Sequence, residues 1–173
     1  MLPLNIGVSI ILPAFNAEKT IGKNLKKIIA ETKNFNSEII VVDDNSTDNT
    51  SKVVEKFKKI KLIKLKSNKG AGNARNVGAK FSKYKNLCFI DSDILIGKNS
   101  IYNLLKRLSK DKKTGSVAAT QDTYNLNKNS WSSDFVCLKS CYGTDDFKYE
   151  KEFSSICSEF CVISKKLFNR IGK

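Results

Sequence analysis

Short apolar runs alternate with longer segments in which apolar residues recur every three or four positions. The runs are rich in β-branched side chains and have the length of buried strands. We predict strands at residues 8–12, 38–42, 61–65, 87–90, 116–120 and 160–163. The segments between them have the spacing of amphipathic helices, as where Ile21, Leu25 and Ile28 recur while lysines occupy the other faces. We predict further helices around 53–57, at 73–81, at 101–108 and from about residue 164.

Alternation of strands and helices is typical of an α/β fold with a mostly parallel sheet and helices on both faces. Ligands of such sheets gather beyond the carboxyl ends of the strands. Polar segments at residues 13–16, 43–46 and 91–93 each follow a predicted strand directly. We therefore expect these three segments to meet at one edge of the sheet.

A chain of 173 residues with 40% apolar residues is expected to form a single domain, residues 1–173. The opening residues make a poor signal peptide, because Asn5, Gly7 and Pro13 interrupt them and no basic residue precedes Lys19. No apolar run approaches the ~20 residues that span a bilayer. We expect a cytoplasmic protein with reduced cysteines, whose membrane contact, if any, is peripheral at the inner face.

The net charge of +14 suits a polyanionic partner, such as a nucleotide, nucleic acid or anionic membrane surface. Only three of the 31 basic residues are arginines, so a solvated lysine-rich surface explains the charge equally well. The chain has no histidine, which excludes Ser-His-Asp and Cys-His catalysis and every metal site that contains histidine.

Asp91 and Asp93 are one residue apart at the end of a strand, where their charges repel. A divalent cation such as Mn²⁺ or Mg²⁺, bound between carboxylates and a diphosphate, would relieve that repulsion. Alone, the pair fits a helix cap or a solvated turn better. Asp43 and Asp44 are placed to accept hydrogen bonds from a base or ribose, and they too could simply cap a loop.

The segment "NKGAGNARNVGAK" brings Asn73 and Arg75 to the start of a helix, where phosphate oxygens would be favoured. Its glycines permit close backbone approach, but their spacing is neither the dinucleotide fingerprint nor a phosphate-binding loop of the Walker type. The alternative is a helix start with small residues for packing, especially at Gly78.

Four segments taken together resemble glycosyltransferase family 2, whose members have the GT-A fold and use nucleotide-diphospho-sugars. They are "VSIILPAFNAEKTI", "EIIVVDDNSTDNT", "NKGAGNARNVGAK" and "FIDSDILI", in the family's order, and the likeness covers about residues 7–120. It implies a metal-dependent, inverting transferase that moves a sugar, from a UDP-sugar in our interpretation, to a glycan or lipid-linked acceptor. The metal would be Mn²⁺ or Mg²⁺.

The resemblance also implies roles for individual residues. Pro13 and Phe15, with Asn16 beside them, would flank the base. Asp44 would bind the base edge with support from Asp43. The residues near ribose, phosphates and metal would be Asn73, Arg75, Asp91 and Asp93, with Asp93 the better candidate for a direct metal ligand.

The family's catalytic base lies after a segment that matches "FCVISKKLFNRIGK", so we expect the base beyond Lys173 and leave the catalytic residue unassigned. Residues 1–120 would then form the nucleotide-sugar-binding part, and 121–173 the start of the acceptor part of an enzyme whose N-terminal portion this is. The weakly patterned residues 125–153 are expected to be a loop-rich insertion.

Three other interpretations remain. Four cysteines in two C-x₃-C pairs could hold Zn²⁺, namely Cys137, Cys141, Cys157 and Cys161. The lysine-rich stretch 56–69 could bind nucleic acid, although it lacks aromatic residues for base stacking and we expect no nucleic-acid partner. The domain could also bind a nucleotide-sugar without catalysing its transfer.

Overall fold

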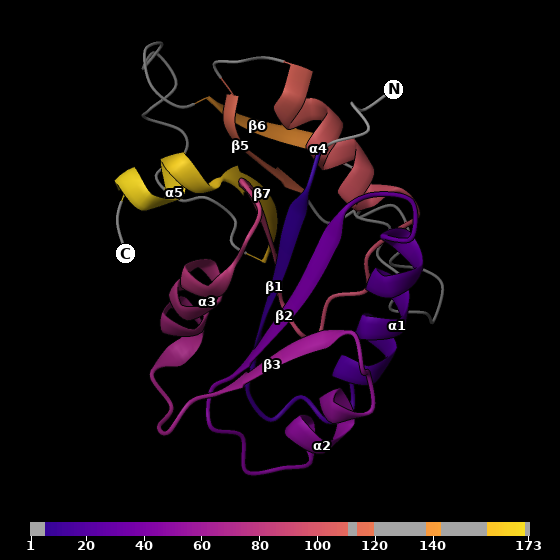
Figure 1. The fold of residues 1–173 in the computed structure, drawn as a ribbon, viewed down its shortest axis with the longest axis vertical. Coiled ribbons are helices and arrows are strands. Elements are labelled where there is room, and N and C mark those ends of the chain that lie inside the picture. Colours follow the sequence, from indigo (N-terminus) through magenta and orange to yellow (C-terminus); the bar gives the residue numbers. More distant parts are fainter. Residues whose placement is uncertain (1–5, 111–113, 120–137, 143–158, 172–173) are drawn as a thin grey trace, which may run out of the picture.

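The computed structural model describes residues 6–110, 114–119, 138–142 and 159–171, and Figure 1 shows their arrangement. The strands are β1 (Val8–Ala14), β2 (Ser37–Asp43), β3 (Ile60–Lys64), β4 (Asn86–Ile90), β5 (Thr114–Ala119), β6 (Leu138–Tyr142) and β7 (Phe160–Ser164). The helices are α1 (Ile21–Glu31), α2 (Thr50–Glu55), α3 (Gly70–Phe81), α4 (Ser100–Lys110) and α5 (Lys165–Ile171). The predicted α/β alternation is confirmed.

The described strands form one seven-stranded sheet in the order β3-β2-β1-β4-β7-β5-β6. β1 pairs in parallel with β2 and β4, and β2 pairs in parallel with β3. β7 is antiparallel to both β4 and β5, and β6 is antiparallel to β5. The chain crosses from one side of β1 to the other between β3 and β4. This reversal creates a crevice at the carboxyl ends of β1 and β4, where open α/β sheets bind ligands.

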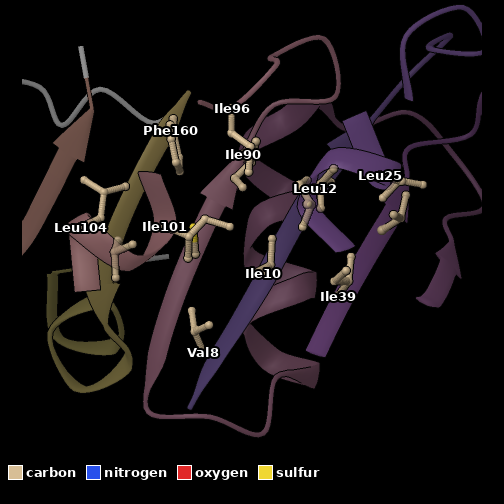
Figure 2. Close-up of a cluster of buried hydrophobic side chains, with 14 of the residues drawn as sticks. Val8, Ile10, Leu12, Leu25, Ile39, Ile90, Ile96, Ile101, Leu104 and Phe160 are labelled. Carbon is tan, nitrogen blue, oxygen red and sulfur yellow. The ribbon is translucent and has the colours of Figure 1, made fainter. Parts of the chain in front are cut away.

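Helices cover both faces of the sheet, as predicted. On one face Val8, Ile10 and Leu12 of β1 pack with side chains of α1, α2 and α4, in the cluster that Figure 2 shows in part. On the other face Ile11 packs in a cluster with Ala79 of α3 and side chains of α5. Successive residues of β1 thus point to opposite faces, and both faces are buried.

Helix α3 packs closely on β1 at a glycine. A Cβ atom built on Gly78 would lie 2.3 Å from Cγ2 of Ile11, closer than real atoms approach. Gly78 is therefore a packing residue, which is the simpler of its two sequence interpretations. The helix begins at Gly70, three residues before the predicted start, because the Asp44 carboxylate accepts the N–H groups of Lys69 and Gly70 there.

Two local predictions need correction. Helix α2 ends at Glu55, so Phe57 lies beyond it, although the ring still packs against the core. Strand β6 lies inside the segment 125–153 that we expected to be loop-rich, because β5 offers it an edge with which to pair. The rest of that segment lies outside the described residues.

Candidate functional site

A cavity of about 380 Å³ opens at the carboxyl ends of β1 and β4. It is lined by residues 13–17, Thr20, Asp44, Ala71 and residues 91–93. Three segments that are far apart in the sequence thus meet at one edge of the sheet, as predicted. Among the described residues that line the cavity, three are aspartates and none is basic. The cavity wall is therefore acidic in a chain whose net charge is +14.

The loop after β1 is fastened to the loop after β2. The N–H of Asn16 donates to Oγ of Ser46 at 3.0 Å, and Oδ1 of Asn16 accepts the N–H of Thr47 at 2.9 Å. One residue further, the N–H of Ala17 donates to Oγ1 of Thr50 at 2.7 Å. Asn16 has a φ of 49°, in the left-handed region that asparagine tolerates. Its amide oxygen thus shapes the rim of the cavity.

Asp48 and Glu18 extend this connection. Oδ2 of Asp48 accepts the N–H of Glu18 at 3.0 Å, and Oε2 of Glu18 accepts the N–H of Asn49 at 2.9 Å. Burial alone would raise the pKa of Asp48, but hydrogen bonds from the Thr50 hydroxyl and from backbone N–H groups outweigh it and leave the pKa below the usual 3.8. Asp48 is thus a loop-fastening residue, consistent with its position before α2.

Pro13 and Phe15 both line the cavity. Pro13 is buried at the end of β1, whereas Phe15 is 48% exposed on the rim. An exposed aromatic ring beside a cavity can stack on a flat ligand such as a nucleotide base. This geometry is compatible with the predicted role of both residues.

The adjacent aspartates Asp43 and Asp44 differ in what they contact. Asp43 accepts the N–H of Ser46 at 2.9 Å and the hydroxyl of Ser51, and it does not line the cavity. Asp44 does line it, and its carboxylate accepts the N–H groups of Lys69 at 3.0 Å and Gly70 at 2.6 Å. Asp43 therefore supports the loop, while Asp44 joins the cavity to the start of α3.

Asp91 forms an ion pair with Arg75 of α3, and Nη2 of Arg75 lies 2.5 Å from Oδ1 of Asp91. Burial raises the pKa of Asp91, and the nearby charges of Asp93 and Glu159 raise it too, while Arg75 lowers it; the net shift is upward. Arg75 thus favours the ionised carboxylate, but it does not line the cavity and its side chain is largely buried. Its Nε has no partner in the described structure.

Asn24 of α1 is a site residue that the sequence interpretation missed. Its side chain is 1% exposed, and Nδ2 donates to the main-chain oxygen of Asp91 at 3.0 Å. Oδ1 of Asn24 has no partner in the part of the chain that the structure describes. The available signal was a polar residue on the apolar stripe of a helix, between Ile21 and Ile28. Such a residue is buried at a cost unless it makes a hydrogen bond.

Asp93 is exposed at the mouth of the cavity, two residues beyond Asp91. The carboxylates of these two residues are the hard oxygen ligands that Mn²⁺ and Mg²⁺ take. Among the described residues, no group of three or more acidic or cysteine side chains could hold a metal ion by itself. The residues therefore fit a cation that draws its remaining ligands from a bound phosphate and water.

The other predicted site residues are placed differently. Asn73 lies in α3 and does not line the cavity, whereas Ala17, Thr20 and Ala71 line it without having been predicted. Cys161 is buried in β7. Cys137 and Cys157 lie outside the described residues, and so does the side chain of Cys141. The zinc-site hypothesis therefore remains a hypothesis.

Solved structures share this fold. A mannosyltransferase from Pyrobaculum calidifontis, in complex with GDP-mannose and Mn²⁺, superposes with a TM-score of 0.71 at 20% identity, covering 95% of this chain and 46% of that one. Staphylococcus aureus TarS in complex with UDP-GlcNAc gives a TM-score of 0.67 at 23% identity, covering 96% of this chain and 47% of that one. The predicted GT-A fold is confirmed.

Curated relatives match part of the chain. An uncharacterized protein of Methanocaldococcus jannaschii is 39% identical over 107 residues, 57% of this chain and 45% of that protein. A poly-β-1,6-N-acetyl-D-glucosamine synthase of Staphylococcus epidermidis is 30% identical over 114 residues, 64% of this chain and 27% of the synthase. The match thus spans less than half the length of either relative. The model of glycosyl transferase family 2 matches residues 9–172, and the chain belongs to that family.

Proposed function

We propose that the cavity binds a nucleoside-diphosphate sugar, a UDP-sugar in our preferred form, and that the protein transfers the sugar with inversion to a glycan or lipid-linked acceptor. The observation that carries the proposal is the meeting of Asp44, Asp91 and Asp93 in one cavity at the strand-order reversal. Family membership and the sugar nucleotides bound by the structural neighbours support it.

Each part of the cavity has a distinct task in this proposal. The ring of Phe15 is available to stack on the base at the rim, and Asp44 is placed to accept a hydrogen bond from the base edge. The loop connection through Asn16 keeps these groups in place before the donor arrives, which reduces the ordering cost of binding. Asp91 and Asp93 face the diphosphate end.

The acidic wall makes a divalent cation necessary for a diphosphate to bind. In the described part of the cavity wall, three carboxylates without a basic residue would repel the donor's negative charges. A cation held by Asp93 and Asp91 would supply the opposite charge and neutralise that of the leaving diphosphate. Arg75 opposes the rise in the pKa of Asp91 and so favours the ionised carboxylate that a cation requires. The Mn²⁺ in the mannosyltransferase complex supports the same choice of metal here.

The test is calorimetric titration of UDP, and of GDP for comparison, into the protein with and without Mn²⁺. We expect measurable UDP binding only with Mn²⁺, and a loss of tenfold or more in Asp93→Ala. Glu55→Ala is the matched control, because it removes an exposed acid from α2, whose partner is Lys64 at 2.7 Å. Equal UDP affinity in the wild type with and without Mn²⁺, and in Asp93→Ala, would overturn the metal-dependent site.

A further inference from the structure

The net positive charge of the chain is concentrated in one stretch of the sequence. Between Lys56 and Ile90 the sequence has ten lysines, one arginine and no acidic residue. This stretch forms β3, which is the edge strand of the sheet, and α3, which covers the neighbouring face. Figure 1 shows α3 on the opposite side of the sheet from α1, with β3 along the edge of the sheet. The basic flank, as the term is used below, consists of exposed residues of β3, α3 and the turns next to them: Lys58, Lys59, Lys61, Lys66, Lys69, Lys80, Phe81 and Lys83.

We propose that the basic flank binds the surface of a membrane that contains anionic phospholipids. Clusters of four to eight lysines attract anionic lipid headgroups, and each lysine near the surface contributes independently. No described helix is long and apolar enough to cross a membrane, so the contact is peripheral. This inference does not depend on the donor site, because none of the residues of the flank lines the cavity.

Phe81 gives the flank an apolar centre. Its ring is 49% exposed at the end of α3, although it is one of the largest apolar side chains on the described surface. Nζ of Lys61 lies 4.8 Å from the centroid of the ring, so β3 and α3 meet at this point. An aromatic ring surrounded by lysines can enter the headgroup region while the ammonium groups contact lipid phosphates.

A lipid surface explains the flank better than nucleic acid does. Lysine presents a compact point charge, and the single arginine of the stretch, Arg75, is committed to Asp91. Lys61 lies over the Phe81 ring and so occupies a face on which a base could stack. The acidic side chains that the described structure places beside this stretch are few: Glu55 pairs with Lys64, Glu38 accepts the N–H of Lys83, and Asp44 accepts the N–H of Lys69.

The position of the flank suits a lipid-linked acceptor. It begins at the cavity, where the N–H of Lys69 binds Asp44, and it continues along α3 to Phe81. At 1.5 Å per residue, the 12 residues of α3 span about 18 Å. A membrane lying along the flank would therefore meet the protein beside the mouth of the cavity without covering the residues that line it.

The test is co-sedimentation of the protein with vesicles, either of phosphatidylcholine alone or of phosphatidylcholine with about 30% phosphatidylglycerol, in the absence of nucleotide. The triple variant Lys58→Gln, Lys66→Gln, Lys80→Gln removes three flank charges for which the structure gives no partner. Its control is Lys23→Gln, Lys26→Gln, Lys33→Gln, which removes three exposed charges on and just after α1. A third variant, Phe81→Ser, tests the apolar centre.

We expect the wild type to bind only the anionic vesicles, and the flank variant to lose about a hundredfold in partitioning. The control should lose much less, and Phe81→Ser should lose severalfold. Equal losses in the two triple variants would show a net-charge effect and overturn the proposal. So would absence of vesicle binding by the wild type, or tighter binding to DNA than to vesicles at the same salt. Mn²⁺-dependent UDP binding by the flank variant would show that it is folded and keep the two proposals separate.

Discussion

Replacing Asn24 with leucine should move stability and donor affinity in opposite directions. The side chain is 1% exposed, donates one hydrogen bond to the main-chain oxygen of Asp91 and leaves its own Oδ1 without a described partner. Loss of the hydrogen bond costs about 1 kcal/mol, whereas removal of an unpartnered buried oxygen returns about 1–3 kcal/mol. Leucine has the same branching and the same number of non-hydrogen side-chain atoms, so the free energy of unfolding should stay the same or rise by up to about 2 kcal/mol.

Donor affinity should fall in the same variant, because Asp91 loses an anchor that comes from a separate helix. Two main-chain bonds remain: the N–H of Asp91 donates to Glu159 at 2.8 Å, and its oxygen accepts the N–H of Ile94 at 3.2 Å. The loop is therefore loosened rather than unfolded. A loss of about 1 kcal/mol corresponds to about a fivefold weaker Kd for UDP with Mn²⁺.

Urea unfolding gives the stability, and calorimetric titration of UDP with Mn²⁺ gives the affinity. Asn24→Asp is the matched variant, because it keeps the shape but replaces the donor with an acceptor that faces the Asp91 oxygen. It should lose both stability and affinity. If Asn24→Leu loses more than about 2 kcal/mol of stability, or if its Kd is unchanged, the interpretation of Asn24 as a positioning residue is wrong.

Two further predictions concern the frame around the cavity. Gly78→Ala should lower the free energy of unfolding by about 1–3 kcal/mol, because the added Cβ would meet Ile11. Gly72→Ala should raise it by up to about 1 kcal/mol, because nothing lies within 4 Å of the added atom. If the two variants shift the thermal unfolding midpoint in the same direction, the packing explanation is wrong. Asp48→Asn should be less stable than the wild type at pH 7, because the folded state lowers the pKa of Asp48. The difference in free energy of unfolding between the two proteins should shrink as the pH falls from 3.8, the usual pKa, through the lower pKa of Asp48 in the folded state. If urea unfolding shows a difference that stays constant down to about pH 2.5, this linkage is refuted.

The parallel half of the sheet could be predicted because its signals are local. Residues 8–12, for example, form an unbroken apolar run, and burial of β1 on both faces requires such a run. The turn residues that follow each strand also reveal where the strands end. Since the carboxyl ends of parallel strands share one edge, the meeting of Asp44 with Asp91 followed from the strand assignments alone.

Features that depend on a distant partner could not be predicted. β7 inserts antiparallel between β4 and β5, although its residues are as apolar as those of a parallel strand. The early start of α3 depends on Asp44, which is 26 residues from Gly70. The different roles of Asp43 and Asp44 likewise depend on which of them the Ser51 hydroxyl reaches. In each case the deciding contact is tertiary and leaves no periodic trace in the sequence.

The distribution of charge unites the two proposed surfaces. A net charge of +14 alone would suggest that an anionic donor binds by direct attraction to lysines, yet the described cavity wall carries aspartates and no lysine or arginine. The stretch that carries most of the net positive charge lies instead on β3, α3 and the turns next to them, where exposed groups in water are screened within about 10 Å at 0.1 M salt. Contacts inside a cavity are screened much less. Donor binding, mediated by a cation, should therefore resist salt, while attachment to a membrane through the basic flank should be released by it. Lysines on the flank can then hold the protein at an anionic surface without competing with the carboxylates for the diphosphate.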